Sequence, residues 1–139
     1  MTDVTPLRLA LRLNAAFSTL SALALLLGHT PLAALLGVES WILLGVGAGL
    51  AAFAAYLLIT AARQDVAKLR AEALRHSLAD FAWVVASIAL IVSGLVTPAG
   101  SWLLAAVAVP VLALGLAQFR GLPPRPGEKK STAAPLFLR

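Results

Sequence analysis

Four long apolar stretches constrain this chain more than any other feature of its sequence. They run from Leu9 to Gly28, from Ser40 to Ala62, from Ser77 to Val96 and from Ser101 to Phe119. Each is close to the roughly 20 residues that a helix needs to cross a hydrocarbon core of about 30 Å. With 60% hydrophobic and 12% charged residues, the chain is too apolar for an ordinary soluble domain. The sequence therefore predicts an all-α integral membrane protein with four spans.

Short segments rich in helix-breaking residues separate these spans. After the first span, Thr30 and Pro31 fit the N-cap and the first position of a short apolar helix that ends near Val38. This helix is too short to cross the membrane, so we expect it to lie at the interface. Thr97 to Gly100 predict a tight turn between the third and fourth spans. The middle segment, residues 63–76, should extend the neighbouring helices or lie on the membrane surface.

Positive charge is confined to alternate connections of the predicted spans. All eleven lysine and arginine residues lie at the start of span one, between spans two and three, or after span four. The other two connections carry only His29 and Glu39 as ionisable residues. Since basic residues stay on the cytoplasmic side, the two termini and the middle segment are predicted to be cytoplasmic. The same bias argues against a dual-topology dimer, which needs nearly balanced charge on its two sides.

These features together predict one membrane domain followed by a tail. Residues 1–120 should form a left-handed, antiparallel four-helix bundle in a plasma membrane, with both termini inside the cell. Residues 121–139 combine prolines with basic residues and are predicted to be a disordered cytoplasmic tail.

A cleaved signal peptide is the alternative interpretation of the first span. Arg8 and Arg12 resemble a basic n-region, and Leu13 to Leu27 resemble an apolar h-region. Cleavage would reverse the predicted side of everything downstream. No small-x-small cleavage site follows the stretch, however, and Asn14 and Ser18 make it more polar than an ordinary h-region. We therefore interpret the stretch as a membrane span.

Four polar residues of the spans are predicted to lie at one depth. Asn14, Tyr56, Asp80 and Gln118 each fall near the cytoplasmic end of their span. At 1.5 Å per residue they come within roughly 10 Å of the inner boundary, so an antiparallel bundle could gather them into one polar cluster. Asp80 is the only acidic residue predicted to lie within the membrane, and an unpaired carboxylate at mid-depth costs about 2.5 to 3.5 kcal/mol.

Two interpretations of Asp80 remain open at this point. In the first, Asp80 caps the third span and accepts hydrogen bonds from first-turn amides and from Asn14 or Gln118. In the second, it is a proton or cation site that faces a cavity open to the cytoplasm, with Asn14, Tyr56 and Gln118 as supporting ligands.

Gly45 and Gly49 form a Gly-xxx-Gly pair in the second span. Such a pair lets another helix approach closely, either within the chain or between copies of it.

No pattern in the sequence predicts catalysis, a metal site or a cofactor. The chain has no cysteine, which excludes thiolate chemistry and disulfides. His29 and His76 are predicted on opposite sides of the membrane and cannot share a metal ion. The net charge of +5 is spread over membrane-flanking segments, which favours anionic lipid headgroups over nucleic acid. We expect a protein that is not an enzyme and that has no cofactor.

Two segments of the spans resemble a group of known proteins. Residues 79–87 (ADFAWVVAS) and residues 17–21 (FSTLS) are similar to segments of uncharacterised small four-span integral membrane proteins of bacteria. The resemblance extends from Leu9 to about Gly121. It implies a bacterial inner membrane as the location, and it implies no activity.

The predicted function is that of a small structural or accessory subunit of a membrane complex. Its partners would be the lipid bilayer and other membrane subunits or further copies of the chain. The alternative is a small transporter or channel in which Asp80 is the proton- or cation-sensitive group. A water-filled cavity that reaches Asp80 would favour the alternative, whereas a closed and dry bundle would count against it.

Overall fold

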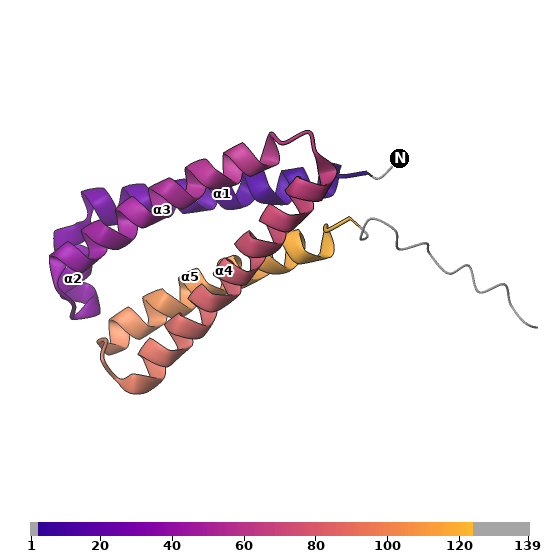
Figure 1. Cartoon of the computed structure of the whole chain (residues 1–139). Coiled ribbons are helices and arrows are strands. Elements are labelled where there is room, and N and C mark those ends of the chain that lie inside the picture. The colour runs from indigo at the N-terminus through magenta and orange to yellow at the C-terminus, as the bar shows by residue number, and fades with distance from the viewer. Residues whose placement is uncertain (1–2, 124–139) are drawn as a thin grey trace, which may run out of the picture.

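The computed structural model describes residues 3–123, which form helices and no strand. Four of the five helices in this part of the chain are long and apolar enough to cross a membrane. The chain is thus an all-α, multi-pass membrane protein. The predicted tail lies outside the described residues from position 124 onward. In chain order the helices are α1 (Thr5–Leu27), α2 (His29–Leu36), α3 (Ser40–Ala61), α4 (Val66–Ser93) and α5 (Pro98–Arg120) (Figure 1).

Helix α4 begins well before the apolar stretch from which the third span was predicted. Its N-cap is Asp65, whose carboxylate accepts hydrogen bonds from the backbone amides of Ala67 at 2.9 Å and Lys68 at 3.1 Å. Residues 66–76 therefore extend α4 as its first turns, which leaves only a short connection after α3. Residues 66–76 and the apolar stretch that follows them therefore belong to one continuous helix.

The structure corrects two predicted helix boundaries. Thr97 to Gly100 do not form the turn between the last two spans. Thr97 is the N-cap of α5 and accepts a hydrogen bond from the amide of Gly100 at 3.0 Å, while Pro98 occupies the first helical position. The chain turns instead at Gly94, whose φ of +69° suits a residue without a Cβ. Helix α2 begins at His29 with Gly28 as its N-cap, so Thr30 is not the cap.

The long helices associate as two pairs, α1 with α3 and α4 with α5 (Figure 1). Contacts within each pair are more extensive than contacts between the pairs. Within the first pair, α3 approaches α1 at Gly47, where a Cβ would lie 2.9 Å from Leu26 Cγ. Within the second, α5 approaches α4 at Gly115, where a Cβ would lie 3.1 Å from Asp80 Cβ. A small residue lets the backbones come close in each pair.

The predicted Gly-xxx-Gly pair does not pack against a helix of this chain. Gly45 and Gly49 are exposed, and no atom lies within 4 Å of a Cβ built on either of them. Gly47 faces α1 instead, because it lies on a different face of α3 from Gly45 and Gly49. The Gly45 and Gly49 face remains open in the described chain.

The two helix pairs are joined at both ends. At the end where α3 leads into α4, a buried apolar core connects α1, α3 and α4; its members are Leu7, Leu11, Ala15, Leu57, Ala61, Leu69 and Ala73. At the other end α2 contacts the start of α5, where the Thr97 amide donates to the Leu36 carbonyl at 3.1 Å. From the end where α3 leads into α4, the two pairs diverge along their length, and α2 bridges them at the far end (Figure 1).

Candidate functional site

Asp80 lies at the centre of a buried polar contact between the helix pairs. Asn14 of α1 donates its side-chain amide to Asp80 Oδ2 at 2.7 Å, and Gln118 of α5 donates to the same oxygen at 2.8 Å. All three side chains are buried, with at most 4% of any of them exposed. The arrangement ties three helices together at one atom. Three of the four residues predicted as a polar cluster are therefore in direct contact.

No ion pair of the described residues compensates the charge that the Asp80 carboxyl group would carry when ionised. Its second oxygen, Oδ1, accepts no hydrogen bond from a described residue. The ion pairs of the described chain join Lys68 to Asp65 and Arg75 to Glu72, and neither includes Asp80. An ionised carboxylate without a cation partner is costly in an apolar medium. The geometry therefore suits a group that binds a proton or a cation.

The interpretation of Asp80 as a helix cap is wrong. The helix begins at Val66, so Asp80 lies in its interior, where the backbone amides donate to carbonyls of the preceding turn. The predicted cap assumed that the third span starts near Ser77. The true N-cap is Asp65. The hydrogen bonds from Asn14 and Gln118 that the same interpretation included are both present.

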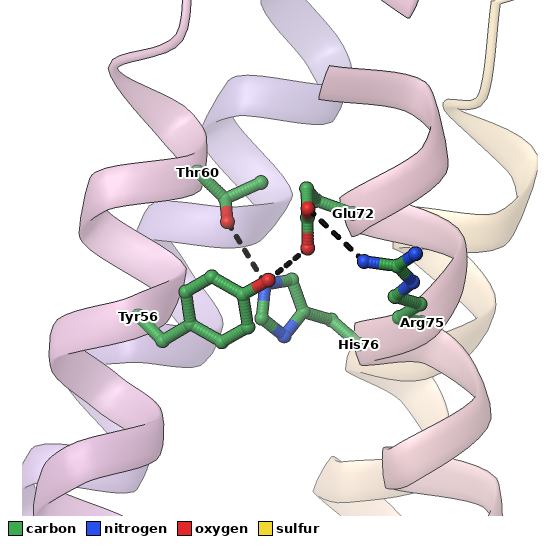
Figure 2. A network of polar contacts seen from close by, with 5 residues as sticks. All are labelled: Tyr56, Thr60, Glu72, Arg75 and His76. Atoms are coloured by element: carbon green, nitrogen blue, oxygen red, sulfur yellow. Dashed lines mark hydrogen bonds and ion pairs between the residues drawn. The ribbon is translucent and has the colours of Figure 1, made fainter. Parts of the chain in front are cut away.

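Tyr56 does not join the Asp80 contact. Its hydroxyl donates to Glu72, a residue of the extended first part of α4 (Figure 2). Glu72 also accepts a hydrogen bond from Arg75, with 3.2 Å between the nitrogen and the oxygen. The predicted depth of Tyr56 is compatible with the Asp80 layer, but its side chain lies on the face of α3 that meets Glu72.

His76 connects this second network to the buried part of α4. Only 2% of its surface is exposed, and its Nε2 lies 3.0 Å from the Thr60 hydroxyl on α3. The rings of Phe53 and Tyr56 meet it edge-on, with centroids 5.3 and 4.7 Å away. Figure 2 shows its other ring nitrogen on the opposite side from Thr60. His76 is thus a buried link between α3 and α4.

One sequence signal could have identified this network. Glu72, His76 and Asp80 recur every four residues and therefore share one face of α4. The pattern becomes visible only when residues 66–76 are recognised as helix. The prediction left open whether these residues extend the helix or lie on the membrane surface, so the shared face was not identified.

A cavity of about 300 Å³ reaches Asp80 from the space between the helix pairs. It is lined by both pairs, with Phe17 of α1, Phe53 of α3 and Trp83 of α4 among its walls. A second cavity of about 290 Å³ adjoins it toward α2, and its lining is almost wholly apolar. The carboxyl group is thus buried in the protein but borders a space large enough for a small ligand.

Comparisons with known proteins do not add to this geometry, since no family model, curated protein or solved structure matches the chain. Residues 3–123 contain no group of three or more histidine, cysteine, aspartate or glutamate side chains that could hold a metal ion.

The hydrogen bond from Asn14 to Asp80 should couple the two helix pairs energetically. We expect the variants Asn14→Ala and Asp80→Ala to show a coupling of about 1 to 2 kcal/mol in a double-mutant cycle of the free energy of unfolding. The measurement is unfolding in mixed micelles or by steric trapping in bicelles. Gln118→Ala with Asp80→Ala should give a coupling of similar size.

The exposed pair Tyr56 and Glu72 is the matched control for this cycle. Tyr56→Phe with Glu72→Gln should show a smaller coupling, because solvent and headgroups compete for that hydrogen bond. Additive effects of Asn14→Ala and Asp80→Ala would contradict the role assigned to the buried contact.

Proposed function

We propose that this chain is a small membrane transporter in which Asp80 takes up and releases a proton or a monovalent cation within the membrane. The observation that carries the proposal is that a buried carboxyl group without an ion-pair partner lines a cavity between two helix pairs. Ionisable residues inside membrane domains that face a cavity mark ion and proton pathways.

A purely structural role does not account for the carboxyl group. Packing and hydrogen bonding at this position need a side chain that accepts from Asn14 and Gln118, and the neutral amide of asparagine has a similar shape and an oxygen acceptor. A carboxylate adds an insertion cost, which is about 2.5 to 3.5 kcal/mol at mid-membrane depth and smaller toward the surface. A proton or cation that binds here would offset this cost, which links occupancy of the site to the stability of the bundle.

The arrangement of the helices supports a transport cycle. The contacts within each helix pair exceed those between the pairs, so each pair can move as a unit. Asp80 lies on one pair and Asn14 on the other, and their hydrogen bond crosses the boundary. Movement of one pair against the other would change access to the carboxyl group, as in transporters whose halves rock around a fixed site.

The proposed setting is the inner membrane of a bacterium, with both termini in the cytoplasm. The distribution of basic residues supports this orientation, and the resemblance to small bacterial membrane proteins supports the location. The four long helices would form a left-handed, antiparallel bundle, and α2 would lie at the outer interface. Asp80 would then lie in the cytoplasmic half of the membrane.

A second candidate function is that of an accessory subunit of a membrane complex. The exposed position of Gly45 on α3 favours it, because this glycine would let a helix of another subunit approach closely. Gly49 is also exposed, but it lines the cavity beside Asp80. A subunit of this kind could be a different protein or a second copy of the chain.

Titration of Asp80 tests the transport proposal. Replacing the exposed Trp41 and Trp102 by phenylalanine leaves Trp83, which lines the cavity, as the reporter. We expect the Trp83 emission of the protein in nanodiscs to follow one titration as the pH changes, because protonation removes a charge beside the indole. Asp80→Asn should abolish the titration, and Glu72→Gln, which changes a carboxylate outside the cavity, should preserve it. A titration that survives in Asp80→Asn would refute the assignment.

The orientation is tested by cysteine labelling, for which the cysteine-free chain is well suited. Gln64→Cys lies in the connection between α3 and α4, and Glu39→Cys lies directly before α3. In intact cells a membrane-impermeant maleimide should label Glu39→Cys and leave Gln64→Cys unlabelled until the membrane is permeabilised. The reverse pattern would overturn the proposed topology.

The accessory role predicts a specific effect at Gly45. Gly45→Leu should leave the fold intact, since no atom of residues 3–123 lies within 4 Å of a Cβ built there, but it should release a subunit that co-purifies in stoichiometric amount in a gentle detergent. Ala51→Leu, at an exposed position on another face of α3, is the matched control and should retain that subunit. If the purified protein has no stoichiometric partner, the accessory role is excluded.

A further inference from the structure

The cavity beside Asp80 presents one carboxyl group in a wall that is otherwise mainly apolar and aromatic. Phe17, Phe53 and Trp83 line it together with aliphatic residues of both helix pairs. Aromatic rings attract cations as well as apolar groups. The negative carboxylate and the rings therefore favour a positively charged ligand.

The polar side chains of the cavity are already largely occupied with one another. Asn14 donates its amide to Asp80 at 2.7 Å, and its Oδ1 lies 3.4 Å from the Ser18 hydroxyl, which donates to it. The remaining polar groups along the lining are the Ser21 hydroxyl, the Trp83 indole and the Oδ1 of Asp80. A ligand of this cavity cannot be recognised through many hydrogen bonds.

This lining excludes two classes of ligand. Sugars, nucleotides and amino acids carry many polar groups, which would be buried here without partners. Metal cations such as Ca²⁺ and Mg²⁺ need about six oxygen ligands, and one carboxyl group with few further oxygens does not supply them. The remaining class is a cation that keeps little hydration and has a largely apolar body.

The second cavity extends the site in a direction that suits such a body. Its volume of about 290 Å³ adds to the 300 Å³ beside Asp80. The two cavities share lining residues of both helix pairs, among them Val46, Leu50 and Trp83, so they adjoin. Together they match the size of pockets that hold drug-sized molecules.

We propose that the two cavities bind a monovalent organic cation, with its charge beside Asp80 and its apolar body in the adjoining cavity. The proposal rests on the proposed function, in which Asp80 binds a proton or a cation, and it names the chemical class of that cation. A single positive charge neutralises the carboxylate. An anion would be repelled, and a dication would leave one charge uncompensated in the apolar wall.

A proton and the organic cation would then compete for the same carboxylate. The other helices present neutral groups around Asp80: Asn14 of α1 and Gln118 of α5 donate to it, and Phe53 of α3 lines the same cavity. On α4 itself the neighbouring titratable residue is His76, one turn earlier. Binding of the organic cation requires ionised Asp80, so lowering the pH should release it. Such competition is the basis of exchange between a proton and a substrate.

The test uses tetraphenylphosphonium and tetraphenylborate, which have similar shapes and opposite charges. Equilibrium dialysis measures the binding of each to the protein in nanodiscs, with empty nanodiscs subtracted. We expect saturable binding of the cation only. Asp80→Asn should weaken it by at least about tenfold, while Glu72→Gln, on the same helix but outside the cavities, should leave it unchanged.

A second variant keeps the proposal testable if Asp80→Asn does not fold. Val46→Phe adds bulk where the cavities adjoin, and it should weaken binding of the cation while Asp80 still titrates. Equal binding of both probes, or undiminished binding by Asp80→Asn, would overturn the proposal. If Trp83 reports a titration of Asp80 but the cation does not bind, the ligand class is wrong and the proposed function stands. If Asp80 does not titrate, the proposed function itself fails.

Discussion

The hydrogen bonds that converge on one oxygen of Asp80 are the interaction on which the rest of the structure depends. Burial of apolar surface gives helices in lipid little reason to associate, so specific polar contacts and close packing determine their arrangement. Asn14 and Gln118 supply two such contacts to Oδ2. Because Asn14 belongs to one helix pair and Asp80 and Gln118 to the other, this atom connects the two halves of the protein. Its charge therefore affects how firmly they are joined.

Protonation of Asp80 changes the strength of this connection without removing it. Amide hydrogen bonds to a carboxylate are stronger than those to a neutral carboxyl oxygen. The ionised form holds Asn14 and Gln118 more firmly, but it also bears the cost of a charge in an apolar medium. Binding a cation at the cavity would keep the strong hydrogen bonds and remove much of that cost. In the proposed function, occupancy of the cavity and the contact between the helix pairs would thus be coupled through one carboxyl group.

Much of the fold could be predicted from the sequence because apolar stretches near 20 residues have few alternatives in a membrane protein. The contact of Asn14, Asp80 and Gln118 could be predicted because depth and polarity both place these residues together. The helical start of α4 was less visible, since charged residues mask helical periodicity, although Asp65 is a suitable N-cap. Tyr56 was grouped with Asp80 because depth can be counted along a helix while the orientation of its face cannot.

The contacts of the glycines in α3 and the presence of the cavity also could not be predicted from the sequence. Gly45, Gly47 and Gly49 all permit close approach, and only the tertiary arrangement selects Gly47 for contact with α1. The cavity lies between the two helix pairs and is lined by residues of both, so it depends on how the pairs are arranged in space. The sequence therefore indicated an important carboxyl group but could not indicate the space beside it.

The two ends that hold the helix pairs together differ in the size of their buried apolar cores, and this difference would bear on how the proposed ligand reaches Asp80. At the end where α3 leads into α4, a core of seven buried apolar residues joins α1, α3 and α4. At the other end, hydrogen bonds run from Thr97 to the carbonyls of Leu35 and Leu36. A smaller apolar core also joins the pairs there, with three buried residues, Ala33, Leu36 and Leu43, and with Leu103 and Leu104 of α5 packed against it. Separating the α2 end breaks fewer packed contacts. The adjoining apolar cavity lies toward this end, so its opening would expose the apolar cavity first and the carboxyl group last.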